Sequence, residues 1–331
     1  MIEPIKPVAH LPQTPLRSVT AARSQAPAKV GWHLEIEPLD TAPASIRSNW
    51  SEAQRLLGSE DFEAALDVID ATLSSAERLG CGEALSARLY CSRIAVAFAA
   101  GHDTSDAKLR ELLMSATSLA TTHFAAYQLG RQLELQQHWK RALFYARIAL
   151  QAADEAGRDS WVGPAHNLNG NLLTAESRFE EAIQHYREAI RWTPKGSLWS
   201  GQIADNMSFA CASLGNLEEA RSWMARALLT LRGVTGPARL SVELDAAFLY
   251  LLCDRSDRAL DYACRARQRA LELDDQRNYA NALLVLAEAA KRVGHRLLAR
   301  RSVSELAECY DREFANVLWT HDVLQLVNLK A

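Results

Sequence analysis

The chain has 331 residues, of which 48% are hydrophobic, 23% are charged and only 7% are aromatic. Its formal charge of −3 is close to neutral for this length, which disfavours nucleic acid and membrane surfaces as partners. No stretch approaches the roughly 20 apolar residues of a membrane span. Residues 1–6 lack a basic region followed by an apolar run, so we expect no secretory signal. We therefore expect a cytoplasmic protein without a membrane partner.

The first 44 residues differ from the rest of the chain. They hold seven of the ten prolines and show no helical period. Proline removes a backbone donor and disfavours helix in the preceding residue, so we expect 1–44 to be a proline-rich flexible arm.

From residue 45 the sequence changes to amphipathic segments of about 15 residues, separated by short polar or glycine-containing breaks. This pattern predicts a helical domain over 45–310. Residues 313–326 are predicted to form one more helix over the last repeat, so 311–331 would be a capping helix and tail.

A short motif recurs along the helical domain. Glu180-Glu181-Ala182-Ile183 has echoes in which the alanine returns after intervals of 42, 35, 40, 38, 39 and 40 residues. The anchor alanines are Ala65, Ala107, Ala142, Ala182, Ala220, Ala259 and Ala299. Such a period is typical of repeat architectures.

The residues around each anchor form an apolar stripe. In the best copy the stripe contains Phe179, Ala182, Ile183, Tyr186, Ala189 and Ile190. These residues lie on one face of a helix. The small residues, Ala182 and Ala189, would let a neighbouring helix backbone come close, so the pattern predicts that the repeats pack against one another.

This copy resembles the tetratricopeptide repeat, a helix–turn–helix unit with a W-x2-L-G-x2-Y…A-x3-F…P signature. The matching residues are Gly170, Leu173, Ala182, Tyr186, Ala189 and Pro194, whereas Asn169 and His166 depart from the motif. The resemblance covers about 45–310. It implies an all-α, right-handed superhelical solenoid of about seven antiparallel helix pairs.

The period near 39 exceeds the family's usual 34 residues. Longer units of this kind look like those in peptide-sensing bacterial regulators and in some adaptor proteins.

In the family, the first helix of each pair lines a concave binding groove. Carrying these groove positions over implies Phe124, Tyr127, Arg131, Asn167, Asn171, Gln202, Asp205, Phe209, Leu244, Phe248, Asn281, Glu288 and Lys291. Phe209 and Phe248 occupy the same slot in successive units and would lie side by side. Asn167 and Asn171 could bind the backbone of an extended peptide. The alternative is that the phenylalanines only pack between units. The groove lacks the lysines and the arginine with which a carboxylate-clamp tetratricopeptide domain would bind the free C-terminal carboxylate of a peptide.

Signatures of catalysis are missing as well. The sequence has no G-x-G-x-x-G, G-x-x-x-x-G-K-[ST], H-E-x-x-H or G-x-S-x-G. The pairs Glu180/Glu181 and Glu218/Glu219 fall in the first turn of helices, where negative charge is stabilising. The histidines and the six cysteines show no metal-ligand spacing. We expect no enzyme activity, no cofactor, no metal and no small-molecule substrate.

One segment is locally basic. Residues 255–301 contain 11 Lys or Arg against 6 Asp or Glu. A solvated convex surface is the simpler interpretation, and a docking face for an acidic partner is the alternative. The patch lacks interleaved aromatic residues, which argues against single-stranded nucleic acid.

Two functions remain open. The first is a non-catalytic scaffold or adaptor that holds a partner protein or peptide in its groove. The second is the sensory or regulatory subunit of a bacterial signalling or transcriptional regulator whose output domain is on another chain. Exposed repeat ends can stack, so homodimerisation through the C-terminal helix also stays open.

Overall fold

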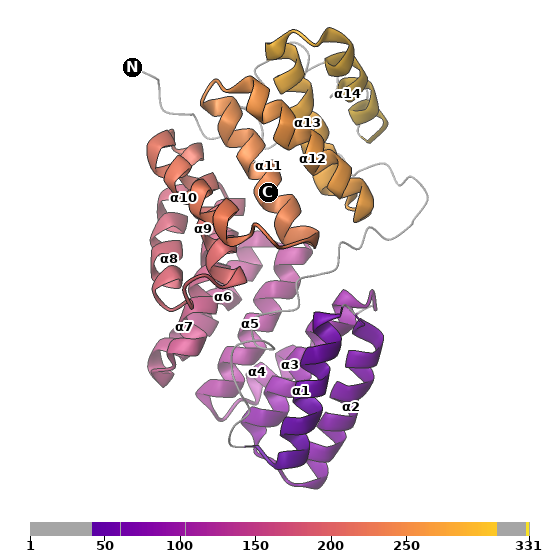
Figure 1. The fold of residues 1–331 in the computed structure, drawn as a ribbon. Coiled ribbons are helices and arrows are strands. Elements are labelled where there is room, and N and C mark those ends of the chain that lie inside the picture. The colour runs from indigo at the N-terminus through magenta and orange to yellow at the C-terminus, as the bar shows by residue number, and fades with distance from the viewer. Residues whose placement is uncertain (1–41, 60, 103, 310–328, 331) are drawn as a thin grey trace. The chain divides into compact units, whose positions relative to one another are not determined.

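The computed structural model describes residues 42–59, 61–102, 104–309 and 329–330. Within these residues the chain forms fourteen α-helices and no strands (Figure 1). The helices follow one another as seven pairs, which confirms the predicted all-α fold and the number of pairs. Most of the predicted arm and the predicted capping helix at 313–326 lie outside the described residues, so both stay predictions.

The chain divides into two compact units. The first, Pro27–Leu172, holds α1 (Ala44–Gly58), α2 (Phe62–Arg78), α3 (Glu83–Ala99), α4 (Ala107–Met114), α5 (Leu119–Leu135), α6 (Trp139–Ala156) and most of α7 (Asp159–Ala175). One apolar cluster joins α1, α2 and α3 around Ile46, Trp50 and Ile69. A second cluster joins α3 to α5 and α6 around Ile94, Phe124 and Leu129.

The second unit includes Leu173–Ala331. Its helices are α8 (Phe179–Arg191), α9 (Leu198–Ser213), α10 (Leu217–Thr230), α11 (Gly236–Leu252), α12 (Ser256–Glu272), α13 (Gln276–Val293) and α14 (Arg296–Cys309). Each first helix packs on its own partner, and α11 also packs on both α9 and α13. The first helices therefore form a continuous layer within this unit.

The anchor alanines lie on the second helix of each pair. Six of them are fully buried: Ala65, Ala142, Ala182, Ala220, Ala259 and Ala299. The small residues seven positions later, such as Ala149, Ala189 and Ala227, are also fully buried. These positions are occupied by small residues because the neighbouring helix packs closely against them. The weakest copy differs, because Ala107 is exposed and Leu109 is the buried residue of the short helix α4.

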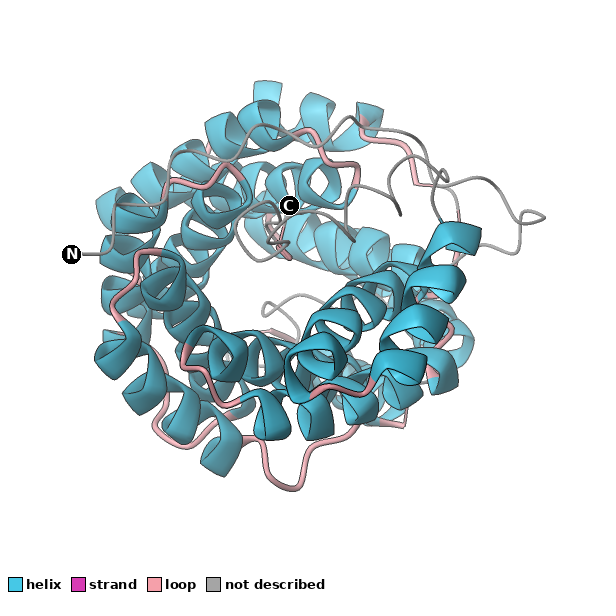
Figure 2. Cartoon of the chain, turned by 90° about the horizontal axis from the view of Figure 1, so that it is seen from above, coloured by secondary structure: helices cyan, strands magenta, loops and turns pink. Residues whose placement is uncertain are grey.

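The turn inside the last five pairs, from α5/α6 to α13/α14, repeats in its backbone. A left-handed residue follows the first helix at Gln137, Ser177, Gly215, Asp254 and Gly294. The next residue then donates its amide to the carbonyl five positions back, as from Arg178 to Leu173 at 2.8 Å. This bond satisfies a carbonyl at the helix end. Loops are consequently short links between helices (Figure 2).

First and second helices differ in burial. Helix α9 is buried on nearly every side, whereas α10 buries only Ala220, Met224 and Ala227. A first helix has neighbours on both flanks and a partner behind it. As a result, polar residues that α9 and α11 carry can lie in a dry environment, which bears directly on the site below.

Candidate functional site

The candidate site lies on the first helices of the second unit. Phe209 on α9 and Phe248 on α11 place their rings 5.5 Å apart, tilted by 32°. Their exposed fractions are only 2% and 5%. The edge of Phe179 on α8 meets Phe209 at 6.3 Å. The rings of Phe209 and Phe248 therefore lie side by side, and they pack between successive helix pairs of the second unit.

Two acidic residues lie one helical turn from these rings. Asp205 on α9 and Asp245 on α11 are each 2% exposed. Asp205 precedes Phe209 by four residues and Asp245 precedes Phe248 by three, so each carboxylate shares a helix face with its ring. Ser241, one turn earlier on α11, donates its hydroxyl to Asp205 Oδ2 at 2.9 Å. Helix periodicity thus brings two buried carboxylates together.

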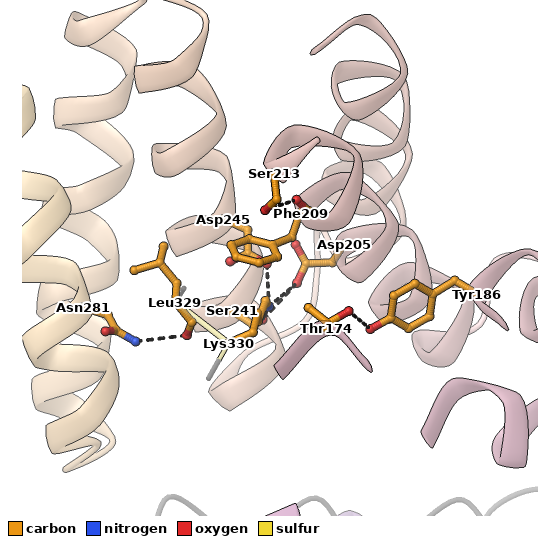
Figure 3. A network of polar contacts seen from close by, with 10 residues as sticks. All are labelled: Thr174, Tyr186, Asp205, Phe209, Ser213, Ser241, Asp245, Asn281, Leu329 and Lys330. Atoms are coloured by element: carbon orange, nitrogen blue, oxygen red, sulfur yellow. Dashed lines mark hydrogen bonds and ion pairs between the residues drawn. The ribbon is translucent and has the colours of Figure 1, made fainter. Parts of the chain in front are cut away.

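The chain's own residues Leu329 and Lys330 lie against this pair (Figure 3). The ammonium of Lys330 lies 2.5 Å from Asp245 Oδ2 and 3.8 Å from Asp205 Oδ2. It donates to Ser241 Oγ at 3.0 Å and lies 5.6 Å from the centre of the Phe209 ring. One cation therefore meets two carboxylates, a hydroxyl and an aromatic face.

The backbone of the same segment is also held. Asn281 on α13 donates its amide Nδ2 to the carbonyl oxygen of Leu329 at 3.3 Å. Leu329 is itself 4% exposed. The groove position carried over from the family thus contacts a peptide carbonyl, and an apolar side chain precedes the cation.

Burial and charge shift the protonation of this cluster. Burial and the neighbouring Asp205 raise the pKa of Asp245 well above its ordinary value, and the Lys330 ammonium opposes that rise. Burial lowers the pKa of Lys330, but the carboxylates of Asp245 and Asp205 outweigh it, and the pKa is raised overall. The pocket therefore favours a charged amine.

Other predicted groove residues of the second unit make local contacts. Leu244 is 2% exposed beside the acidic pair. Glu288 on α13 pairs with Arg292 at 2.8 Å and with Lys291 at 3.5 Å, both on its own helix. Glu288 is buried by these partners and does not join the contacts that the structure gives to Lys330.

The first unit holds the remaining predicted positions. Tyr127 is buried, which raises its pKa to about 12, and Arg131 forms an ion pair with Glu134 on the same helix, α5. Asn167 and Asn171 lie half-buried on α7. The Oδ1 atom of Asn167 is buried and accepts no hydrogen bond from the described residues. A binding role for these four residues stays a prediction.

Sequence reasoning missed three members of the site. The family's groove position in the sixth repeat is Leu244, and its binding role stays a prediction; Asp245, one residue later, carries the carboxylate that pairs with Lys330. Sequence reasoning also missed Ser241 and Lys330. A usable signal was present, because Asp205 and Asp245 are acidic residues inside apolar first helices, spaced by one repeat period. No local pattern pointed to Lys330, since it lies 89 residues from Ser241 in sequence.

The basic segment 255–301 is partly neutralised by its neighbours. Glu243, 1% exposed on α11, accepts from Arg239 at 2.8 Å and from Arg269 at 3.0 Å. Arg267 donates to Glu305 at 2.7 Å. These contacts favour a structural role for part of the excess charge.

The described part of the chain contains no group of three or more His, Cys, Asp or Glu residues placed to hold a metal ion. Five cysteines are free thiols there, with Cys91 and Cys211 buried and Cys264 exposed. None of the described helices has the length and hydropathy needed to cross a bilayer.

Comparison with known proteins identifies the fold. No family model matches the chain, and no curated protein matches its sequence. A Rap protein complexed with Competence and Sporulation Factor matches in structure with a TM-score of 0.63 and 11% identity, over 84% of this chain and 78% of that one. The apo form of RapI matches with a TM-score of 0.54 and 12% identity, over 83% and 98%. By its fold, this chain is a helical repeat protein of the tetratricopeptide type.

Proposed function

We propose that the chain is a non-catalytic scaffold that holds an extended segment of a partner polypeptide against the first helices α9, α11 and α13. Repeat solenoids of this type present such a layer of first helices as an extended binding surface. The proposal concerns the second unit, where the layer carries both apolar and polar contact groups.

One observation carries this proposal. The segment Leu329–Lys330 already lies on the layer as a short peptide would. Its backbone accepts a hydrogen bond from Asn281, and its lysine pairs with Asp245. Backbone recognition by an amide side chain combined with a pocket for one side chain is how extended peptides are commonly bound.

The comparisons support the same direction. The Rap protein that is similar in fold is seen in complex with Competence and Sporulation Factor. That likeness also favours the alternative function, a sensory subunit whose partner chain delivers the output. The two functions differ in consequence, because a sensor must change its affinity for a second protein when its ligand binds, whereas a scaffold need not.

A peptide array tests the proposal. Random 12-residue peptides are probed with the full chain and with its Lys330→Ala variant, and binders are measured by calorimetry. We expect one-to-one binding that falls about fivefold in Asn281→Leu, because one backbone hydrogen bond contributes about 1 kcal/mol. The matched control is Gln268→Leu, the same change of an exposed amide on the second helix α12. Binding that is absent from both chains, or equally reduced by both substitutions, would contradict the proposal.

A further inference from the structure

The carboxylates of Asp205 and Asp245 make an unusual element in a helical repeat core. The corresponding layer could be filled by apolar side chains, which would avoid the cost of burying charge. Burying a carboxylate is expensive unless a cation and hydrogen bonds compensate, and two adjacent carboxylates raise that cost. A pair buried at 2% exposure therefore calls for a cation.

The contacts of Lys330 show which chemistry fits. Its ammonium has an acid on α9, an acid and a hydroxyl on α11, and the face of Phe209. Cation–π attraction and charge pairing both act on the same group. Two acceptors of the pair receive no hydrogen bond from the described residues: Asp205 Oδ1, and Asp245 Oδ2, which lies within ion-pair distance of Lys330. The pocket thus has room in its bonding for a further donor.

Lys330 comes from the same chain as the pocket. A tethered ligand competes at an effective concentration that commonly reaches millimolar. A second peptide must displace Lys330. Its apparent association constant is therefore the intrinsic constant multiplied by the fraction of chains whose pocket is empty.

We propose that Asp205, Asp245, Ser241 and Phe209 form a pocket for a lysine or arginine side chain of the partner peptide, and that Lys330 fills it in cis until that peptide displaces it. This inference rests on the proposed function and names the ligand chemistry of its site. The residue before the cation in the partner is apolar, as Leu329 is, and Asn281 binds the backbone carbonyl of that residue.

The first test measures binding in trans. The probe is a fluorescein-labelled peptide of residues 326–331, capped at both ends so that the lysine is the only charged residue of the peptide; the label is the same in every probe that is compared. We expect Lys330→Ala to bind the probe at least about tenfold more tightly than the unaltered chain, because the competitor is gone. A probe with norleucine in place of lysine should lose about tenfold or more in affinity, and an arginine probe should retain binding.

Each contrary result has a meaning. Equal affinity of the two chains, or failure of Lys330→Ala to bind the lysine probe, overturns occupation in cis. Equal affinity of the lysine and norleucine probes overturns the cation pocket. If the array described above yields uncharged peptides that still need Asn281, the scaffold function stands and the cation pocket falls. Circular dichroism checks that Lys330→Ala keeps its helical content. The variant Lys330→Gln, which also lacks the charge, should bind the probe as Lys330→Ala does.

The second test uses the unaltered chain. Pulse acetylation followed by mass spectrometry compares Lys330 with Lys140 and Lys195, which are exposed on second helices or their ends. We expect Lys330 to react at least about tenfold more slowly, because an amine held by two carboxylates must dissociate before it reacts. Adding excess lysine probe should speed its reaction. Reaction of Lys330 at the rate of the two reference lysines overturns the proposal.

Discussion

Phe209 and Phe248, 39 residues apart in sequence and 5.5 Å apart between ring centres, belong to the same slot of successive repeats. Of these two rings, Phe209 is the one with a cation from the described residues over its face, the ammonium of Lys330. The pair therefore combines a packing contact, which both residues share, with a contact to the Lys330 ammonium that Phe209 makes.

This difference predicts that the same Phe→Leu substitution has different effects on probe binding at the two positions. Phe209→Leu and Phe248→Leu should each reduce the free energy of unfolding by about 1 kcal/mol, through lost aromatic packing. Phe209→Leu should also weaken binding of the lysine probe to Lys330→Ala chains about threefold to tenfold, because it removes the cation–π contact. Fluorescence anisotropy checks this. The idea fails if Phe248→Leu weakens probe binding as strongly as Phe209→Leu.

Probe binding should depend on pH through Asp245. Burial and Asp205 raise its pKa, and an incoming ammonium lowers it, so binding of the probe releases a proton. Affinity should rise with pH across the titration of Asp245, by up to about tenfold per unit. The charges that act on the Lys330 ammonium are those of Asp245 and Asp205, which favour its charged form, and that of Arg277, which opposes it. Asp245→Asn should flatten the profile, and an unchanged slope in that variant would refute the assignment.

His123 should make stability depend on pH. The imidazole is fully buried on α5, bonds through Nδ1 to the carbonyl of Ala149 at 2.9 Å, and stacks on Trp161 at 4.9 Å. Burial lowers its pKa from the ordinary value of 6.5 to about 4. The unfolded chain therefore binds the proton first as pH falls, and stability present above about pH 6.5 is lost progressively towards pH 4, by roughly 3 kcal/mol.

Urea unfolding followed by tryptophan fluorescence at several pH values measures this loss. The variant His123→Asn keeps a donor near Ala149 but does not titrate, so its stability should vary less over the same range. Parallel curves for the two chains would show that His123 is not the source.

The recurring turn predicts opposite effects for two adjacent glutamines. Gln137 has φ 60°, in the left-handed region, whereas Gln136 has φ −84°. Gln137→Gly should stabilise the chain by about 1 kcal/mol, because it removes the strain of a side chain in that region. Gln136→Gly should destabilise it by about 0.5–1 kcal/mol through added freedom of the unfolded chain. Thermal unfolding compares them, and equal shifts would contradict the argument.

The sequence predicted the helices and their pairing well, because these depend on local periodicity. Ala182 and Ala220 marked buried contacts correctly, since a close helix approach leaves room only for a small side chain. Ala107 was misleading as a burial marker, because in the short helix α4 the neighbouring Leu109 supplies the core contact.

The site was only partly predictable. Asp205, Phe209, Leu244 and Phe248 were all predicted from the groove positions of the tetratricopeptide family, with Leu244 four residues before Phe248. The residue three positions back, Asp245, lies on the same face and is the one in the pair. Lys330 could not be found this way, because its contact depends on the path of the whole chain rather than on a helical period.

The repeated turn has a consequence for how such a chain can change in length. The hydrogen bonds that end each first helix span only five residues, as between His138 and Leu133 at 2.8 Å and between Arg255 and Tyr250 at 2.8 Å. Each of these hairpins thus contains, within its own turn, the hydrogen bond that ends its first helix. Duplication or loss of one hairpin would leave these terminations intact, and exchange of hairpins at matching turns is the natural way to build chimaeras from this protein.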